Sequence, residues 1–230
     1  MVCAGVLRGL LLFSLFYSGL WGVEGKTLDQ NTLPRAIKFL RQNYQSGSAN
    51  QVAIAFNAPV DKCADYLDNN FLHTYPGRTV RNALNSAQRL YVGQELIAAK
   101  PRPIPGIIPP RNQHSEYVLL KLPTINTSPM KQLLNKDKTG CVVFYTYNSP
   151  CTSTCIRPGS CYNIIDALDM FKQHNGPKAF VFTEVWKHDC DKDISTNLRE
   201  VLKRVPLYRC RDNNNCVACT ADNLNSCTRK

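Results

Sequence analysis

The sequence lacks the motifs that mark several large enzyme classes. It contains no glycine-rich phosphate-binding loop, no H-E-x-x-H pair and no G-x-S-x-G turn. Their absence argues against enzymes that hold nucleotide phosphates in such a loop, against zinc proteases and against serine hydrolases. Any catalytic residues must therefore be sought in other patterns.

Long apolar segments are also missing. The apolar segment at residues 9–21 has thirteen residues, which as a helix would rise about 20 Å, whereas a bilayer core is about 30 Å thick. Arg8 precedes it and small residues follow at 23–25, which predicts a cleaved secretory signal peptide over residues 1–25; an uncleaved anchor is the alternative. We expect a secreted, extracellular protein without stable membrane insertion, with one domain at residues 26–230.

Acidic residues are scarce relative to basic ones. The chain has 17 Asp and Glu against 28 Lys and Arg, which gives a formal net charge of +11. This charge favours polyanionic partners such as nucleic acid, anionic membrane surfaces or glycans. A basic surface that serves only solubility is an equal alternative.

Cysteine, in contrast, is abundant, with eleven residues. Removing the signal peptide would take Cys3 and leave ten, an even number in an oxidising compartment, where disulfides are expected. Four of them fall in the polar segment 210–230, which predicts a C-terminal tail held by disulfides. Asn126, in Asn-Thr-Ser, is an N-glycosylation acceptor and predicts a surface position.

Hydrophobic periodicity predicts an α/β fold. Strands are expected at residues 51–57, 141–147, 178–185 and 206–210, and residues 89–100 fit a strand or a helix. Helices are expected at residues 32–44, 61–75, 79–90, 114–121, 128–135, 149–176 (interrupted at 158–159) and 193–205, with a proline-rich loop at 100–111. Strands that alternate with helices in the second half favour a mostly parallel sheet covered by helices.

Two short segments carry the strongest chemical signal. The letters H-S-E begin at His114, and S-P-C-T-S-T-C covers residues 149–155. Each segment opens a predicted helix, and a predicted core strand lies between them. The combination resembles the H-x-E…P-C-x-x-C signature of zinc deaminases.

The residue types suit a catalytic zinc site, which needs three protein ligands and one position left for water. His114, Cys151 and Cys155 would supply one imidazole and two thiolates, with the cysteines on one helix face four positions apart. Glu116 would not bind the metal and would instead transfer protons. In the alternative, both cysteines are disulfide-bonded. The cysteine count does not distinguish a zinc site from disulfides, because the other eight cysteines can pair evenly in either case.

H-S-E together with Y-T-Y-N-S-P-C-T-S-T-C resembles the cytidine deaminase superfamily, and within it the AID/APOBEC branch. The signal peptide and the high cysteine content further resemble the secreted AID/APOBEC-like deaminases of fishes and other vertebrates. The resemblance covers about residues 110–205. It implies a three-layer cytidine-deaminase-like fold, a five-stranded mixed, mostly parallel sheet flanked by helices, and Zn²⁺ held by the three ligands above.

The resemblance also implies a function. We expect a zinc-dependent hydrolytic deaminase that acts on cytosine, with single-stranded DNA or RNA as the partner, and a role in immunity. One alternative is a deaminase of free cytidine, deoxycytidine or their nucleotides. Another is a catalytically silent, disulfide-rich binding or antimicrobial protein on the same fold.

The chain departs from the branch in ways that concern the base more than the chemistry. The branch usually has Trp before the Ser of this motif, whereas here Asn148 precedes Ser149. The ligand cysteines are separated by three residues rather than the commoner two. Trp186 and His188 stand where the branch places a substrate-reading loop; they are candidates for stacking on a base and contacting a phosphate. Packing of Trp186 beneath the loop is the alternative.

Overall fold

A computed structural model of the chain describes residue 28, residues 32–45, residue 47, and residues 51–109, 111–211 and 215–229. The expected signal peptide at residues 1–25 lies outside these ranges, so it stays a prediction. Within the described ranges, the structure contains no helix that is both long and apolar enough to cross a membrane.

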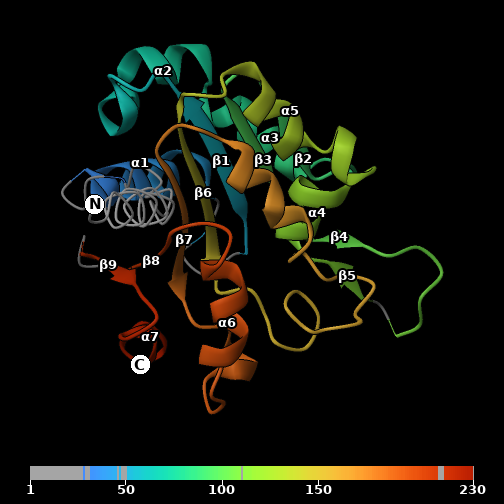
Figure 1. Cartoon of the computed structure of the whole chain (residues 1–230). Coiled ribbons are helices and arrows are strands. Elements are labelled where there is room, and N and C mark those ends of the chain that lie inside the picture. The colour runs from blue at the N-terminus through green and yellow to red at the C-terminus, as the bar shows by residue number, and fades with distance from the viewer. Residues whose placement is uncertain are drawn as a thin grey trace, which may run out of the picture.

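A seven-stranded mixed sheet forms the centre of the molecule (Figure 1). Its strands follow the order β2-β3-β1-β6-β7-β8-β9. They comprise β1 (Ala53–Ala58), β2 (Leu90–Val92), β3 (Leu96–Ala99), β6 (Cys141–Asn148), β7 (Lys178–Glu184), β8 (Leu207–Cys210) and β9 (Cys216–Cys219). Parallel pairing is confined to β6–β7 and β7–β8, and the other neighbours are antiparallel. The α/β class and the mixed sheet are therefore confirmed, with seven strands rather than five. The expectation that the sheet is mostly parallel is wrong, because two of its six neighbouring pairs are parallel and the other four are antiparallel.

The two additional strands have local causes. The ambiguous segment 89–100 folds as the hairpin β2–β3, closed where the Gly93 amide donates to the Leu96 carbonyl at 2.8 Å. In the tail, β9 pairs with the edge of β8, and a disulfide joins the paired residues Cys210 and Cys216. The polar tail thus contributes a strand that its composition did not indicate.

Helices cover both faces of the sheet, which gives three layers. One core cluster packs α1 (Leu33–Tyr44), α2 (Asn69–Thr74) and α3 (Gly77–Asn85) against one face. The other packs α4 (Ser115–Lys121), α5 (Pro129–Lys136), α6 (Ser195–Leu202) and α7 (Leu224–Thr228). Strand β6 divides its side chains between them: Phe144 joins the second cluster and Tyr145 the first, as the two-residue period of a strand requires.

Short 3₁₀ helices complete the element order. They are η1 (Cys63–Tyr66), η2 (Ile125–Thr127), η3 (Ala167–Gln173) and η4 (Lys187–Asp189). The helix expected over residues 149–176 is wrong: residues 149–151 are irregular, residues 152–156 form a turn, and η3 is the helical element of the segment. The loop expected at 100–111 is also corrected, because β4 (Arg102–Pro103) pairs with β5 (Asn112–Gln113) at its base.

Three disulfides are present in the described residues: Cys63–Cys141, Cys210–Cys216 and Cys219–Cys227. The latter two hold the C-terminal tail as predicted. The fourth bridge that an even pairing of eight cysteines would give is not formed, because Cys161 and Cys190 are free thiols. Asn126 is exposed, and its glycosylation stays a prediction.

Candidate metal centre

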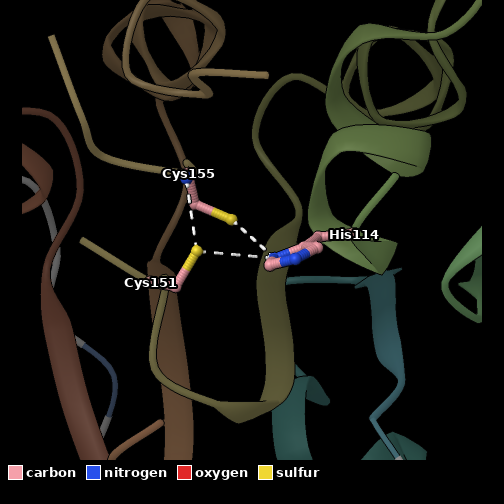
Figure 2. Close-up of side chains that lie close together, drawn as sticks. All are labelled: His114, Cys151 and Cys155. Carbon is pink, nitrogen blue, oxygen red and sulfur yellow. Dashed lines mark hydrogen bonds between the residues drawn. The ribbon is translucent and has the colours of Figure 1, made fainter. Parts of the chain in front are cut away.

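His114, Cys151 and Cys155 come together at the end of β6. His114 precedes the first residue of α4, and both cysteines lie in the turn that follows β6. His114 Nδ1 is 3.1 Å from the sulfur of Cys155 and 3.6 Å from that of Cys151. Figure 2 shows the imidazole ring directed at the two sulfur atoms. The sequence therefore identified three side chains that meet, although about 40 positions separate the segments.

The spacing of the three ligand atoms fits one zinc ion. All lie within 4.8 Å of one another, and this is the one such group of His, Cys and acidic side chains found among the described residues. Zinc bonds of about 2.0–2.1 Å to nitrogen and about 2.3 Å to sulfur, at a tetrahedral angle, separate a nitrogen and a sulfur ligand by roughly 3.6 Å. The distance to the Cys151 sulfur, 3.6 Å, matches this value, and the distance to the Cys155 sulfur, 3.1 Å, is shorter. The cluster can hold a metal through three protein ligands.

The turn at residues 151–155 brings the two thiols together without a helix. The Cys155 amide donates to Cys151 Sγ at 3.4 Å, and the next amide, from Ile156, donates to the Cys151 carbonyl at 3.1 Å. The side chain of Cys151 thus takes the hydrogen bond that a helix would direct to its carbonyl. Although the predicted helix is absent, both cysteines still face His114.

Asp189 anchors this turn from the neighbouring loop. Its carboxylate, in η4 after β7, is buried and accepts hydrogen bonds from the Thr152 amide at 2.8 Å and the Thr152 hydroxyl at 2.7 Å. Lys192 donates to the same carboxylate at 2.8 Å. Because Thr152 follows Cys151 directly, Asp189 holds a residue next to a ligand. The sequence carried no signal for this contact, since 37 positions separate the pair.

The two thiols have opposite electrostatic tendencies. Hydrogen bonds from Cys155, His114 and Thr154 lower the pKa of the Cys151 thiol and favour its thiolate. The pKa of the Cys155 thiol is raised, chiefly by its hydrogen bond to Cys151 and by burial. The pair thus resembles a thiolate beside a thiol, and a bound metal ion would displace the remaining proton.

Glu116 lies in the first turn of α4 with only 1% of its surface exposed. Thr146 donates to its Oε1 at 3.0 Å, and Ser115 donates to its Oε2 at 3.1 Å. Burial raises the pKa of the Glu116 carboxyl, and the neighbouring His114 partly opposes the effect. The carboxyl is close enough to Cys151 and Cys155 to influence their charges. A carboxyl with a raised pKa accepts a proton more readily than an ordinary one, which suits proton transfer.

Gln51 is a site residue that the sequence analysis missed. From the start of β1, its Nε2 donates to Glu116 Oε1 at 3.1 Å, to Thr146 at 2.9 Å and to Ser115 at 3.3 Å. Its Oε1 accepts from the backbone and side-chain nitrogens of Asn148, at 3.0 and 2.7 Å. One amide group thus connects the buried carboxylate to the end of β6. The one available signal for Gln51 in the sequence was its position as a polar first residue of a predicted strand.

Comparison with known families agrees with this geometry. The sequence profile of the family described as Secreted Novel AID/APOBEC-like Deaminase 1, or SNAD1, matches residues 30–230. The chain belongs to the SNAD1 family. This confirms the resemblance to secreted AID/APOBEC-like deaminases. Searches of curated protein sequences and of solved structures found no match.

The SNAD1 family is described as secreted, and the three disulfides accord with an oxidising compartment. Its description as a deaminase-like family makes the His/Cys/Cys cluster the expected metal site. The family assignment thus confirms a secreted deaminase class, whereas the metal, base and polymer belong to the proposal below.

The remaining predicted site residues of this SNAD1 member lie near the His/Cys/Cys cluster. The Trp186 ring lies 6.4 Å from that of His114 and 5.2 Å from that of His188, between centroids. Ser149 is buried, and its hydroxyl accepts a hydrogen bond from the Trp186 amide at 3.1 Å, so it holds the loop in place. Asn148 is bound to Gln51. The roles of all four residues toward a substrate stay predictions.

Proposed function

We propose that this chain is a zinc-dependent hydrolytic deaminase of cytosine in single-stranded nucleic acid. The observation that carries the proposal is the pairing of a three-ligand cluster with a buried carboxyl in the first turn of α4, the helix that His114 precedes. His114, Cys151 and Cys155 would hold Zn²⁺, and Glu116, two positions from His114, is placed to handle protons beside it.

Zinc bound there would activate a water molecule for attack on the amine-bearing ring carbon. Glu116, whose pKa is raised by burial, would take one proton from this water and give it to the ring nitrogen. It would then take the second proton from the added hydroxyl and give it to the amine, which leaves as ammonia. Gln51, Thr146 and Ser115 hold this carboxyl in a single orientation through hydrogen bonds to both of its oxygens. Burial keeps bulk water from competing for those bonds.

The surroundings of the cluster support a nucleobase substrate. Trp186 is half-buried beside His114 and offers an aromatic face, on which a base can stack. His188 and Lys187 in η4 are exposed next to it and can meet a phosphate. The net charge of +11 favours a polyanionic strand over a neutral nucleoside.

The same proposal places the mature protein outside the cell after loss of residues 1–25. N-terminal sequencing of protein collected from the medium of a secretory host should begin at Lys26. Protein that keeps residues 1–25 and stays with the membrane fraction would contradict cleavage.

Glu116→Gln tests the catalytic part of the proposal. The substitution preserves shape but removes the proton-transferring group, so deamination of cytosine-containing single strands should fall by roughly 10²–10⁴-fold. Zinc content and thermal stability should be retained. Glu200→Gln removes an acid on α6 whose side chain is 44% exposed, and this control should keep full activity.

Two outcomes would contradict the proposal. Retention of activity in Glu116→Gln would show that this carboxyl does not transfer the proton. A wild-type protein that contains zinc but deaminates no strand, nucleoside or nucleotide would point to the silent binding protein.

A further inference from the structure

A polar cavity is lined in part by Gln51, whose side chain also contacts the Glu116 carboxyl. Its volume is about 360 Å³, and its lining includes two cations, Arg89 and Lys100, together with the side-chain amides of Gln51, Asn85 and Asn112. Among the lining residues that the structure describes, none is acidic. The cavity therefore presents hydrogen-bond donors and positive charge, which suits an anion.

The topology places this cavity at the same end of the sheet as the metal ligands. The start of β1 lies opposite the end of β3 and beside Thr146 of β6, through the pairs Ala53–Ala99 and Ala53–Thr146. Lys100 directly follows β3. Asn112 lies two positions before His114, and Gln51 contacts Glu116 at 3.1 Å. One residue, Gln51, thus borders both the cavity and the catalytic carboxyl.

The two cations are held in place by the fold. Lys100 Nζ donates to Asn85 Oδ1 at 2.6 Å, and Arg89 Nη1 donates to the Pro101 carbonyl at 2.8 Å. The Lys100 amide also donates to the Arg89 carbonyl at 3.0 Å. Because the Asn85 oxygen accepts from Lys100, its amide nitrogen remains a donor. The fold thus arranges donors from α3, the β2 hairpin and the segment after β3 around one space.

Two further observations indicate that this arrangement serves to bind a ligand and not only to stabilise the fold. Arg89 has a φ of 50°, a left-handed conformation that Gly or Asn adopts more readily than Arg. Burial lowers the pKa of the Lys100 amine, and the nearby Arg89 adds to the effect. Both the strain and the repulsion between like charges are disadvantages that a bound anion would offset.

We propose that the cavity lined by Arg89 and Lys100 binds a backbone phosphate of a single-stranded polynucleotide, next to the nucleotide whose base enters the metal site. This inference rests on the proposed function. Arg, Lys and side-chain amides are the groups that proteins use to contact phosphates. A free nucleoside has no phosphate and gains nothing from the cavity, so the cavity selects a strand over a nucleoside.

The test is strand binding by the full secreted chain in the Glu116→Gln background, which removes turnover. The variant Arg89→Asn with Lys100→Gln removes both charges, and Asn tolerates the backbone of position 89. The control, Lys62→Gln with Arg78→Asn, removes the same charge from two exposed residues at the opposite end of β1 and α3. The probes are fluorescein-labelled oligodeoxycytidine and oligocytidine, with a heparin fragment as a non-nucleotide polyanion.

We expect the cavity variant to bind one or both strands at least roughly tenfold more weakly than the control, the effect of losing one hydrogen bond to a charged group. The slope of log Kd against log salt concentration should fall by about 0.7 for each phosphate that the protein no longer neutralises. Heparin binding should change equally in both variants. Equal strand binding in the two variants, equal loss for heparin and strands, or no strand binding by the parent protein would each overturn the inference.

Failure of this inference is distinguishable from failure of the proposed function. In the background that keeps Glu116, the cavity variant should lose turnover of strands while it keeps any turnover of free deoxycytidine. If the enzyme deaminates strands and the cavity variant does so as well as the control, the proposed function stands and the cavity assignment fails. If nothing is deaminated, the binding experiment still tests whether the cavity binds a phosphate of the strand.

Discussion

The side-chain nitrogen of Gln51 lies 3.1 Å from Glu116 Oε1, although 65 positions separate the two residues. The same amide group accepts two hydrogen bonds from Asn148 at the end of β6. Gln51 therefore fixes the Glu116 carboxyl relative to the strand that leads to Cys151 and Cys155.

Gln51→Ala should lower the turnover number by roughly ten- to a hundredfold, because a carboxyl displaced by a fraction of an ångström transfers protons poorly. The zinc content should change little. Steady-state kinetics on a cytosine-containing strand provide the measurement. Gln42→Ala, an exposed change on α1, is the control; equal kinetics of the two variants would remove Gln51 from the site.

Asp189→Ala should weaken zinc binding by roughly 10–100-fold, the usual effect of removing a group that orients a metal ligand. The reason is the loss of both hydrogen bonds to Thr152, which hold the turn carrying Cys151. Competition with a chromophoric chelator measures the affinity. Asp222→Ala removes an exposed acid from the tail and should leave it unchanged.

Because a buried acid is removed, Asp189→Ala could also alter stability. Thr152→Val removes one of the two bonds and keeps Asp189 in its ion pair with Lys192. This milder variant should weaken zinc binding in the same direction. Full zinc affinity in both variants would show that the turn needs no anchor.

His174 should make the fold sensitive to acid. Its side chain is 3% exposed, its Nε2 is 2.7 Å from the Gly140 carbonyl, and its Nδ1 has no partner in the described residues. Burial lowers the pKa of His174, and Lys178 adds to the effect. The unfolded chain therefore binds the proton at a higher pH than the folded one, and stability should fall as pH drops below about 6.5.

Thermal or denaturant unfolding between pH 5 and 7 tests this expectation. The slope due to His174 is at most about 1.4 kcal/mol per pH unit. His174→Gln removes the titrating group and should flatten the profile, whereas His73→Gln, an exposed histidine on α2, should not. An unchanged slope in His174→Gln would assign the acid sensitivity elsewhere.

Cysteine chemistry can be checked directly. Peptide mass mapping of the secreted protein should find the bridges Cys63–Cys141, Cys210–Cys216 and Cys219–Cys227. Alkylation of the native protein should label exposed Cys161 first, and the two buried ligand thiols should react only after metal removal and unfolding. A bridge between Cys161 and Cys190 would contradict the free thiols of the structure.

The sequence predicted the elements whose signals are local. Ser128 accepts a hydrogen bond from the Lys131 amide at the start of α5, where a capping Ser followed by Pro129 was expected. The apolar run at 141–147 became β6, and the segment beginning at His114 became α4. These features depend on residues a few positions apart, so the sequence contains their causes.

Features that depend on distant partners were not predictable. The turn at residues 151–155 replaces a helix because a sulfur atom accepts the Cys155 amide and Asp189 fixes Thr152 from another loop. Gln51 lies far in sequence from every residue that its amide contacts, and no local pattern marks such a residue.

The zinc content of protein purified from a secretory host, measured beside His114→Ala, tests the central claim most directly. The account predicts about one zinc per chain, lost in His114→Ala, with Cys151 and Cys155 alkylated as free thiols after denaturation. Absence of zinc, together with disulfides at Cys151 and Cys155, would contradict the metal centre and the deaminase mechanism built on it.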